Sequence, residues 1–256
     1  MKVRILGSGT SSGVPRVGND WGACDPGDTR NRRMRASILV ETATTRILVD
    51  TGPDMREQLL AAGVDRVDAV IWTHDHADHT HGIDDLRQIY HAMRQPVRGL
   101  ARPATAAILR DRFAYVFAGM DGYPPTVMLD ELPDTLTIGD IAIRVVDQPH
   151  ATIISAGLRF EANGRAIGYA TDFNVMTDDM RALYAKLDVW IVDVLRRHPH
   201  PSHPYLAEAL PWIAELAPRQ AALTHLDQSM DYATLLAELP PGVVPAHDGL
   251  EFEVGR

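Results

Sequence analysis

Short apolar runs, separated by turns containing Gly, Pro and Asn, recur along the whole chain. Val- and Ile-rich runs predict strands, and apolar residues three and four positions apart, such as Met55, Leu59 and Leu60, predict helices. Asn163-Gly164 between two apolar runs predicts a hairpin. We expect strands over residues 3–6, 36–41, 46–50, 69–73, 135–138, 141–146, 155–161, 166–170, 189–194, 220–224 and 250–254. We expect helices over residues 54–62, 84–94, 103–118, 178–183, 205–216 and 232–239.

Strands predominate in both halves of the chain, and helices lie between them. This order favours an α/β (α+β) sandwich, in which two mixed sheets pack face to face with helices on their outer sides. No Pro-rich or Ser/Gly-rich linker, internal repeat or low-complexity tract interrupts the chain. We therefore expect a single domain over residues 1–256.

The composition narrows the possible partners. The 256 residues include 25 Lys and Arg against 34 Asp and Glu, a net charge of −9, which disfavours a long nucleic acid but not a small anionic substrate. The single cysteine excludes an intramolecular disulfide. No apolar stretch reaches the roughly 18 residues of a membrane span, and the first apolar run is too short for a signal peptide. We expect a soluble, cytoplasmic protein without a membrane partner.

Histidines concentrate at residues 74–81 and 198–203. In the first group, His74 and His76 follow the predicted strand 69–73 and are two positions apart, so a loop can turn both imidazoles toward one ion. Asp78 and His79 lie one turn further on and can reach a second ion. Imidazole nitrogen together with carboxylate oxygen suits Zn²⁺, Mn²⁺ or Fe.

Three further polar residues, His150, Asp172 and His225, each follow an apolar run directly. One such residue alone is more often a cap or a loop residue, but three at predicted strand ends indicate further ligands, because functional residues gather where strands end in loops. A carboxylate such as Asp172 can bridge two ions, while His150 and His225 complete one ion each. The chain thus offers enough ligands for a dinuclear centre.

The order His-x-His-x-Asp-His, followed by His, Asp and His, resembles the metallo-β-lactamase superfamily of dinuclear hydrolases. The resemblance covers nearly the whole chain and implies an αββα sandwich with the site at one edge of the sheets. Asp50-Thr51-Gly52 matches the first motif of that superfamily, in which the aspartate supports a ligand rather than binding metal. The resemblance also implies the ligand sets: His74, His76 and His150 for one ion, Asp78, His79 and His225 for the other, and Asp172 bridging both.

A finer resemblance lies in the N-terminal segment 6–15, LGSGTSSGVP, and in Asn31-Arg32-Arg33. These motifs are similar to the phosphoribosyl 1,2-cyclic phosphate phosphodiesterase group of phosphonate catabolism. In that group the residue matching His203 contacts the substrate phosphate, which implies a substrate-binding and catalytic role for His203. His198 and His200 match no such role, and we interpret them as loop histidines on a solvated face.

The chain departs from this group in its N-terminal loop. Members often carry a third, structural zinc on three cysteines and a histidine, and the matching positions here are Asn19, Trp21, Cys24 and Gln228. We therefore predict two divalent metal ions, Zn²⁺ or Mn²⁺, and no third structural zinc. We expect packing of Trp21 to hold the loop instead, and we interpret Cys24 as a leftover ligand position or a surface thiol, unreactive in either case.

These features predict a hydrolase that cleaves a small phosphodiester, in particular a cyclic ribose or nucleotide phosphate, by attack of a metal-bridging hydroxide. His203 would donate to the phosphoryl or leaving oxygen, and Asp78, besides binding metal, can orient the nucleophile. Two alternatives share the ligand set. One is a thioester hydrolase of the glyoxalase II type, against which only the N-terminal motif and His203 argue, and the other is a tRNA-processing-type nuclease, against which the net charge argues. A complete ligand set disfavours a non-enzymatic metal-binding protein.

Several features stay open at this level. The turn at residues 7–10 can bring backbone near the metals, and the aromatic segment 113–125 can cover the pocket or pack on the core. The Arg32-Arg33 pair can bind a substrate phosphate or lie in a solvated loop. The oligomeric state is not determined, although the resemblance is compatible with a homodimer.

Overall fold

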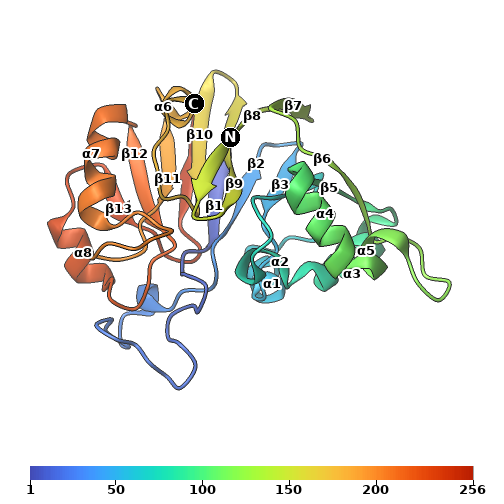
Figure 1. Cartoon of the computed structure of the whole chain (residues 1–256), viewed down its shortest axis with the longest axis horizontal. Coiled ribbons are helices and arrows are strands. Elements are labelled where there is room, and N and C mark those ends of the chain that lie inside the picture. The colour runs from blue at the N-terminus through green and yellow to red at the C-terminus, as the bar shows by residue number, and fades with distance from the viewer. Residues whose placement is uncertain (256) are drawn as a thin grey trace.

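Two seven-stranded β-sheets lie face to face, and helices cover the outer side of each (Figure 1). The fold is given by a computed structural model that describes residues 1–255. The expected sandwich architecture is confirmed. No helix among the described residues is long and apolar enough to cross a membrane.

The first sheet has the strand order β14-β1-β2-β3-β4-β5-β6. Its β14, β1, β2 and β3 pair in antiparallel fashion, and β3 to β6 run parallel. Its strands are β1 (Lys2–Gly7), β2 (Ser37–Glu41), β3 (Arg46–Val49), β4 (Ala69–Trp72), β5 (Val97–Ala101), β6 (Val127–Glu131) and β14 (Glu251–Glu253).

The second sheet has the strand order β13-β12-β11-β10-β9-β8-β7. Its β7 to β10 form antiparallel pairs, and β10 to β13 run parallel. The predicted Asn163-Gly164 turn connects β9 to β10. Its strands are β7 (Thr135–Ile138), β8 (Ile141–His150), β9 (Ile153–Ala162), β10 (Arg165–Ala170), β11 (Val189–Asp193), β12 (Gln220–Thr224) and β13 (Val243–Pro245).

The helices connect the strands along the outer faces. Pro103 opens α4 as expected, since its missing N–H costs nothing in the first helical turn. The predicted helix 103–118 is in fact two helices that break at Phe113. The α-helices are α1 (Met55–Ala62), α2 (Ala77–Thr80), α3 (Leu86–Met93), α4 (Pro103–Arg112), α5 (Ala114–Ala118), α6 (Asp178–Tyr184), α7 (Leu206–Leu216) and α8 (Tyr232–Glu238), and the 3₁₀ helices are η1 (Thr29–Asn31) and η2 (Ile83–Asp85).

Three apolar layers hold these elements together. The central layer fills the space between the sheets with residues such as Val3, Ile71 and Phe160. One outer layer packs α1, α3, α4 and α5 on the first sheet around Trp72. The other packs α6, α7 and α8 on the second sheet around Trp190. Because both faces of each sheet are covered, many of its strands read as continuous apolar runs.

Strands β5, β6 and β13 were not expected from the sequence. Gly99 and Arg98 interrupt the apolar run of β5, and β6 ends on two acidic residues. The strand β13 has only three residues and ends on a proline. Such short or mixed segments become strands only because a neighbouring strand supplies hydrogen bonds.

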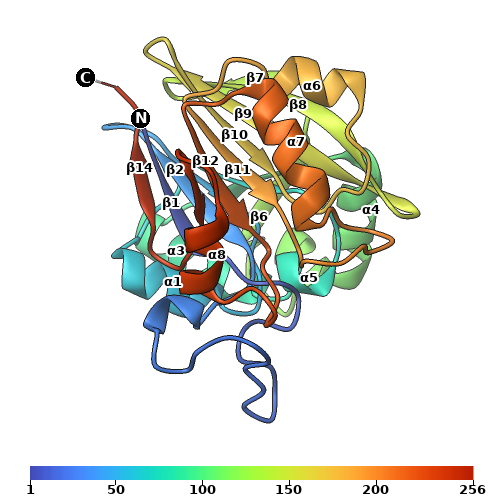
Figure 2. The ribbon, with the colours of Figure 1, turned by 90° about the vertical axis from the view of Figure 1, so that its left-hand side faces the viewer.

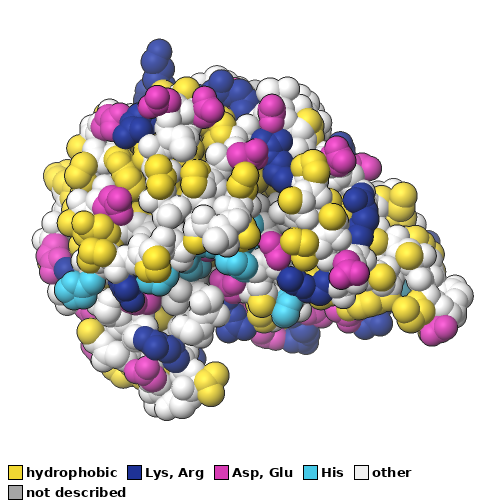
Figure 3. Space-filling model, in the orientation of Figure 1, with side chains coloured by type: hydrophobic (Ala, Val, Ile, Leu, Met, Phe, Trp, Pro, Cys, Tyr) yellow, Lys and Arg dark blue, Asp and Glu magenta, His cyan; other side chains and the backbone are white. Residues whose placement is uncertain are grey.

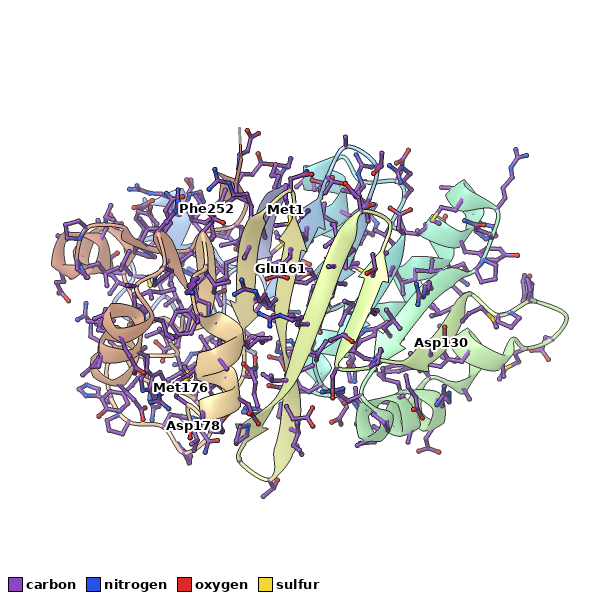
Figure 4. All side chains as sticks on the ribbon, turned by 90° about the horizontal axis from the view of Figure 1, so that it is seen from above. Met1, Asp130, Glu161, Met176, Asp178 and Phe252 are labelled. Carbon is purple, nitrogen blue, oxygen red and sulfur yellow. The ribbon has the colours of Figure 1, made fainter. Side chains whose placement is uncertain are left out.

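The parallel strands place their carboxyl ends at one edge of the sandwich. Residues after β3, β4, β10, β11 and β12 therefore meet there, although they come from both halves of the chain. The opposite edge, seen from above, carries the labelled Met1, Glu161 and Phe252 (Figure 4). The long N-terminal loop after β1 projects beside the first edge (Figures 1 and 2).

Candidate metal centre

The His-rich motif forms a tight loop and the short helix α2 directly after β4. Asp50-Thr51-Gly52 after β3 packs against it, with the Thr51 N–H donating to the His79 carbonyl at 2.8 Å. Gly52 is required by this contact, because a Cβ there would collide with the Asp78 carbonyl oxygen. The two motifs therefore act as one structural unit.

Three candidate site residues hold a left-handed backbone. Asp50 (φ 65°), Asp172 (φ 54°) and His225 (φ 60°) follow β3, β10 and β12, and none of them is glycine. A positive φ costs energy for such residues, and this strain persists only where the surrounding structure imposes it. The sharp turn redirects each side chain out of the strand and toward the shared edge.

The structure brings all seven predicted ligands together. His74, His76, His150 and Asp172 offer ligand atoms that lie within 4.8 Å of one another, and so do Asp78, His79 and His225. Asp172 lies between the two groups, with Oδ1 3.7 Å from His150 Nε2 and 3.6 Å from His225 Nε2. Histidines gather in a hollow on the face shown in Figure 3. Whether these residues bind two ions with Asp172 bridging stays a prediction.

The carboxylates of this cluster are held in the ionised form. Burial opposes ionisation of Asp172, but His225, His79 and His74 hold the pKa of its carboxyl well below the ordinary value. Burial likewise opposes ionisation of Asp78, and His79 and His225 keep the pKa of that group well below normal. The cluster therefore keeps two ionised carboxylates, whose oxygens can bind a cation in place of the imidazole protons.

The imidazoles supply the matching nitrogen donors. The Nε2 atoms of His74, His79 and His225 are buried and have no hydrogen-bond partner among residues 1–255. A buried polar atom without a partner is costly, and two metal ions, one at His74 and the other at His79 and His225, would satisfy these three atoms. Since the donor set of imidazole nitrogen and carboxylate oxygen suits Zn²⁺ or Mn²⁺, the residues present fit a divalent metal.

Neighbouring groups orient the imidazoles. His79 Nδ1 donates to Asp50 Oδ2 at 2.8 Å, and Asp50 also accepts from the Thr73 N–H at 2.8 Å. His150 Nδ1 donates to the Ser202 carbonyl at 2.8 Å. Each bond puts the ring proton on Nδ1 and leaves the Nε2 lone pair for a metal. Asp50 thus takes the supporting position that the resemblance implied.

His203 lies beside the ligand set. Its Nδ1 donates to Asp193 Oδ2 at 2.7 Å, and its ring stacks on His225 with centroids 4.7 Å apart. Asp193 was not expected at the site, because it lies inside the predicted strand 189–194. The available signal was the one used for Asp172, namely the first charged residue after an apolar run.

Arg33 holds the N-terminal loop in a way that was not expected. Trp21 is half-buried, so the packing expected of it is partial. The buried Arg33 guanidinium donates to the Met230 carbonyl at 2.7 Å and to the Asp227 carbonyl at 3.3 Å. Arg33 is therefore neither a ligand of the substrate phosphate nor part of a solvated loop. The guanidinium of its neighbour Arg32 lies over the Trp21 ring, 5.2 Å from the ring centroid. Cys24 is buried, so it is not a surface thiol, and it belongs to none of the ligand clusters found among the described residues. The absence of a third zinc stays a prediction.

The turn at residues 7–10 lies next to the cluster, as expected. The Leu226 N–H donates to the Ser8 carbonyl at 2.9 Å, and the Thr10 N–H donates to the Leu226 carbonyl at 3.2 Å. These bonds fix the chain immediately after the candidate ligand His225.

The aromatic segment does not cover the cluster. Phe117 packs edge-on against Trp72 in the core. Tyr115 and Tyr123 line a separate cavity of about 220 Å³ beside α3, whose lining includes none of the seven candidate ligands.

The second histidine group requires a correction. His198 is exposed, as expected, but His200 is half-buried, with its ring centroid 5.2 Å from that of His203. His200 therefore belongs to the rim of the site rather than to a solvated face.

The comparison with known families agrees with this geometry. The β-lactamase superfamily domain matches residues 45–226, a range that contains all seven candidate ligands. The chain belongs to the metallo-β-lactamase superfamily. Proteins with the metallo-β-lactamase fold are hydrolases that bind divalent metals such as zinc.

Individual proteins match the chain over almost its whole length. The crystal structure of a new diphosphatase from the PhnP family superposes on this chain with a TM-score of 0.90. The two sequences are 31% identical, and the match covers 99% of this chain and 98% of the diphosphatase. Human tRNase Z, short form, has a TM-score of 0.72 at 17% identity over 100% of both chains, a likeness of fold alone. An octanoyltransferase of Porphyromonas gingivalis is 33% identical over 98% of this chain and 51% of its own length. The chain thus spans about half of that relative.

Proposed function

We propose that this protein is a dinuclear metal-dependent phosphodiesterase that hydrolyses a small cyclic ribose or nucleotide phosphate. The observation that carries the proposal is the position of His203. Asp193 holds its ring in a stack on the candidate ligand His225, which puts a proton donor directly beside the ligand set. Similarity to a PhnP-family diphosphatase over nearly the whole chain supports the same class of chemistry.

The side chains divide into ligands and proton-handling groups. Bound by the seven candidate ligands, two divalent ions would supply Lewis acidity and an activated water. Because Nδ1 of His203 is committed to Asp193, its Nε2 is the atom that holds a proton for the leaving oxygen. The Asp193 carboxylate fixes the orientation of the ring. Asp78 Oδ2, 3.6 Å from His225 Nε2, would also orient the attacking water.

The charge of the chain supports a small substrate. A net charge of −9 repels a long phosphate backbone, whereas a single phosphodiester is attracted by the local ions alone. The name of the octanoyltransferase belongs to a protein about twice as long, so it does not bear on this choice.

An activity panel on the metal-reconstituted protein tests the proposal. It compares bis(p-nitrophenyl) phosphate, 2′,3′-cyclic nucleotides, ribose 1,2-cyclic phosphate, a glutathione thioester and a precursor tRNA. We expect turnover of the cyclic phosphates and of the aryl diester, and loss of this turnover when a chelator removes the metal. Turnover of the thioester or the tRNA without any small phosphodiester would overturn the proposal.

A further inference from the structure

The second histidine group holds a side chain to which the proposed function gives no role. His200 lies on the loop between β11 and α7, three residues before His203. The loop is firmly held, with the Arg196 guanidinium donating to the Pro199 carbonyl at 2.7 Å and the Asn174 amide donating to the Pro201 carbonyl at 3.0 Å. The position of the His200 ring is therefore defined by the fold rather than by a mobile surface.

Ser202 determines which nitrogen of His200 carries the proton. The Ser202 backbone N–H, which can only donate, lies 3.3 Å from His200 Nδ1, and the Ser202 hydroxyl lies 3.2 Å from it. Nδ1 is thus the acceptor, and the proton of the neutral ring sits on Nε2. Burial, together with His203 and Arg196, lowers the pKa of His200 and keeps the ring neutral. The structure records no hydrogen bond from this Nε2 to residues 1–255.

The rings of His225, His203 and His200 follow one another from the buried ligand set to the half-buried rim. The His203 ring stacks on that of His225 with centroids 4.7 Å apart, and the His200 ring lies 5.2 Å from that of His203. If phosphorus lies at the ligands and the leaving oxygen lies at His203, His200 is the next imidazole beyond that oxygen. A neutral N–H donor at that place suits a phosphate oxygen.

We propose that His200 contacts the substrate and donates its Nε2–H to an oxygen of the phosphate group that faces His203. This inference rests on the proposed function and assigns a second imidazole donor to the same site. His198 provides a matched control, because it lies on the same loop but is exposed and has no recorded side-chain hydrogen bond within residues 1–255.

The test uses the metal-loaded protein and the variants His200→Ala, His200→Gln and His198→Ala. Binding of inorganic phosphate is measured by calorimetry, and hydrolysis of bis(p-nitrophenyl) phosphate by steady-state kinetics. We expect His200→Ala to weaken phosphate binding and to lower kcat/KM, each about tenfold, as for a lost hydrogen bond to a charged group. His200→Gln, whose amide reaches the position of Nε2, should restore most of this loss. His198→Ala should match the wild type.

Two results would overturn the inference. One is equal behaviour of His200→Ala and His198→Ala. The other is a loss of bound metal or of thermal stability in His200→Ala, since His200 would then act only through Ser202 and His150. If phosphate binding depends on His200 but no phosphodiester is hydrolysed by the wild type, the inference stands and the proposed function fails.

Discussion

Each well-oriented imidazole of the site commits one nitrogen to the protein and leaves the other free. His79 donates to Asp50, His150 to the Ser202 carbonyl and His203 to Asp193. Two of these acceptors are carboxylates at strand ends, and the third is a backbone carbonyl. In each ring the partner holds Nδ1, so Nε2 is the atom left to face a metal or a substrate.

The His203–Asp193 pair gives a prediction at this scale. We expect His203→Ala to lower kcat by about a hundredfold with metal content unchanged, because it removes the proposed proton donor. Asp193→Asn should lower kcat in the same direction, and the double variant should be little worse than His203→Ala, since the two residues act as a unit. Steady-state kinetics and elemental analysis of each variant measure this. Unchanged turnover in His203→Ala would remove its assigned role.

The break between α4 and α5 matters at the scale of elements. A continuous helix was expected over 103–118, but the chain turns a corner at Phe113, between α4 and α5. At this corner Arg112 and Phe113 both contact the His-rich segment. Arg112 donates to the Asp75 carbonyl at 2.6 Å, between two candidate ligands, and Phe113 packs edge-on against His81 with centroids 5.6 Å apart. These two contacts support the His-rich loop on the side that faces away from the candidate ligand atoms.

Removing this support should loosen metal binding. We expect Arg112→Ala to weaken Zn²⁺ affinity about tenfold in competition with a chromophoric chelator, as for other groups that position ligands from behind. Arg110→Ala is the matched control, because Arg110 lies on the same helix and donates to the distant Leu129 carbonyl at 2.8 Å. Equal affinities in the two variants would contradict the positioning role.

Segments far apart in the chain are tied together at the scale of the whole molecule. Asp231, at the start of α8, accepts from the Thr234 N–H at 2.9 Å, the Asp25 N–H at 3.1 Å and the Asn31 amide at 2.8 Å. Partial burial opposes its ionisation, but these hydrogen bonds hold the pKa of Asp231 well below the ordinary value. One carboxylate therefore anchors the N-terminal loop to the C-terminal half.

The lowered pKa of Asp231 predicts a pH-dependent contribution to stability. Its stabilising effect is complete above the unfolded pKa, about 3.9, and is lost as the pH falls toward the folded pKa. In Asp231→Asn an amide N–H₂ would face the Asp25 N–H and the Asn31 amide, which are themselves donors. We therefore expect the substitution to lower the free energy of unfolding by about 1–3 kcal/mol at pH 7.

Urea unfolding of the metal-free protein at several pH values measures this effect without metal release. The difference between wild type and Asp231→Asn should be largest at neutral pH and should narrow below about pH 4. A difference that stays constant, or that grows on acidification, would contradict the assignment.

Much of this protein can be predicted from local pattern alone. Apolar runs determine most strands, and His74, His76, Asp78 and His79 are recognisable because they lie close together in sequence. His150, Asp172 and His225 are recognisable only as polar residues after strands, a signal that applies equally to the overlooked Asp193. Local pattern carries this information because strand formation and ligand chemistry depend on neighbouring residues.

Only the tertiary structure decided the surroundings of residues whose partners are distant in sequence. It separated His200 from His198, buried Arg33 against carbonyls near the C-terminus, and placed the aromatic residues 115 and 123 around a separate cavity. It also made strands of 97–101 and 127–131, whose own patterns are weak. The physical reason is that a side chain's role is determined by what packs against it and accepts its hydrogen bonds, and those groups are chosen by the fold.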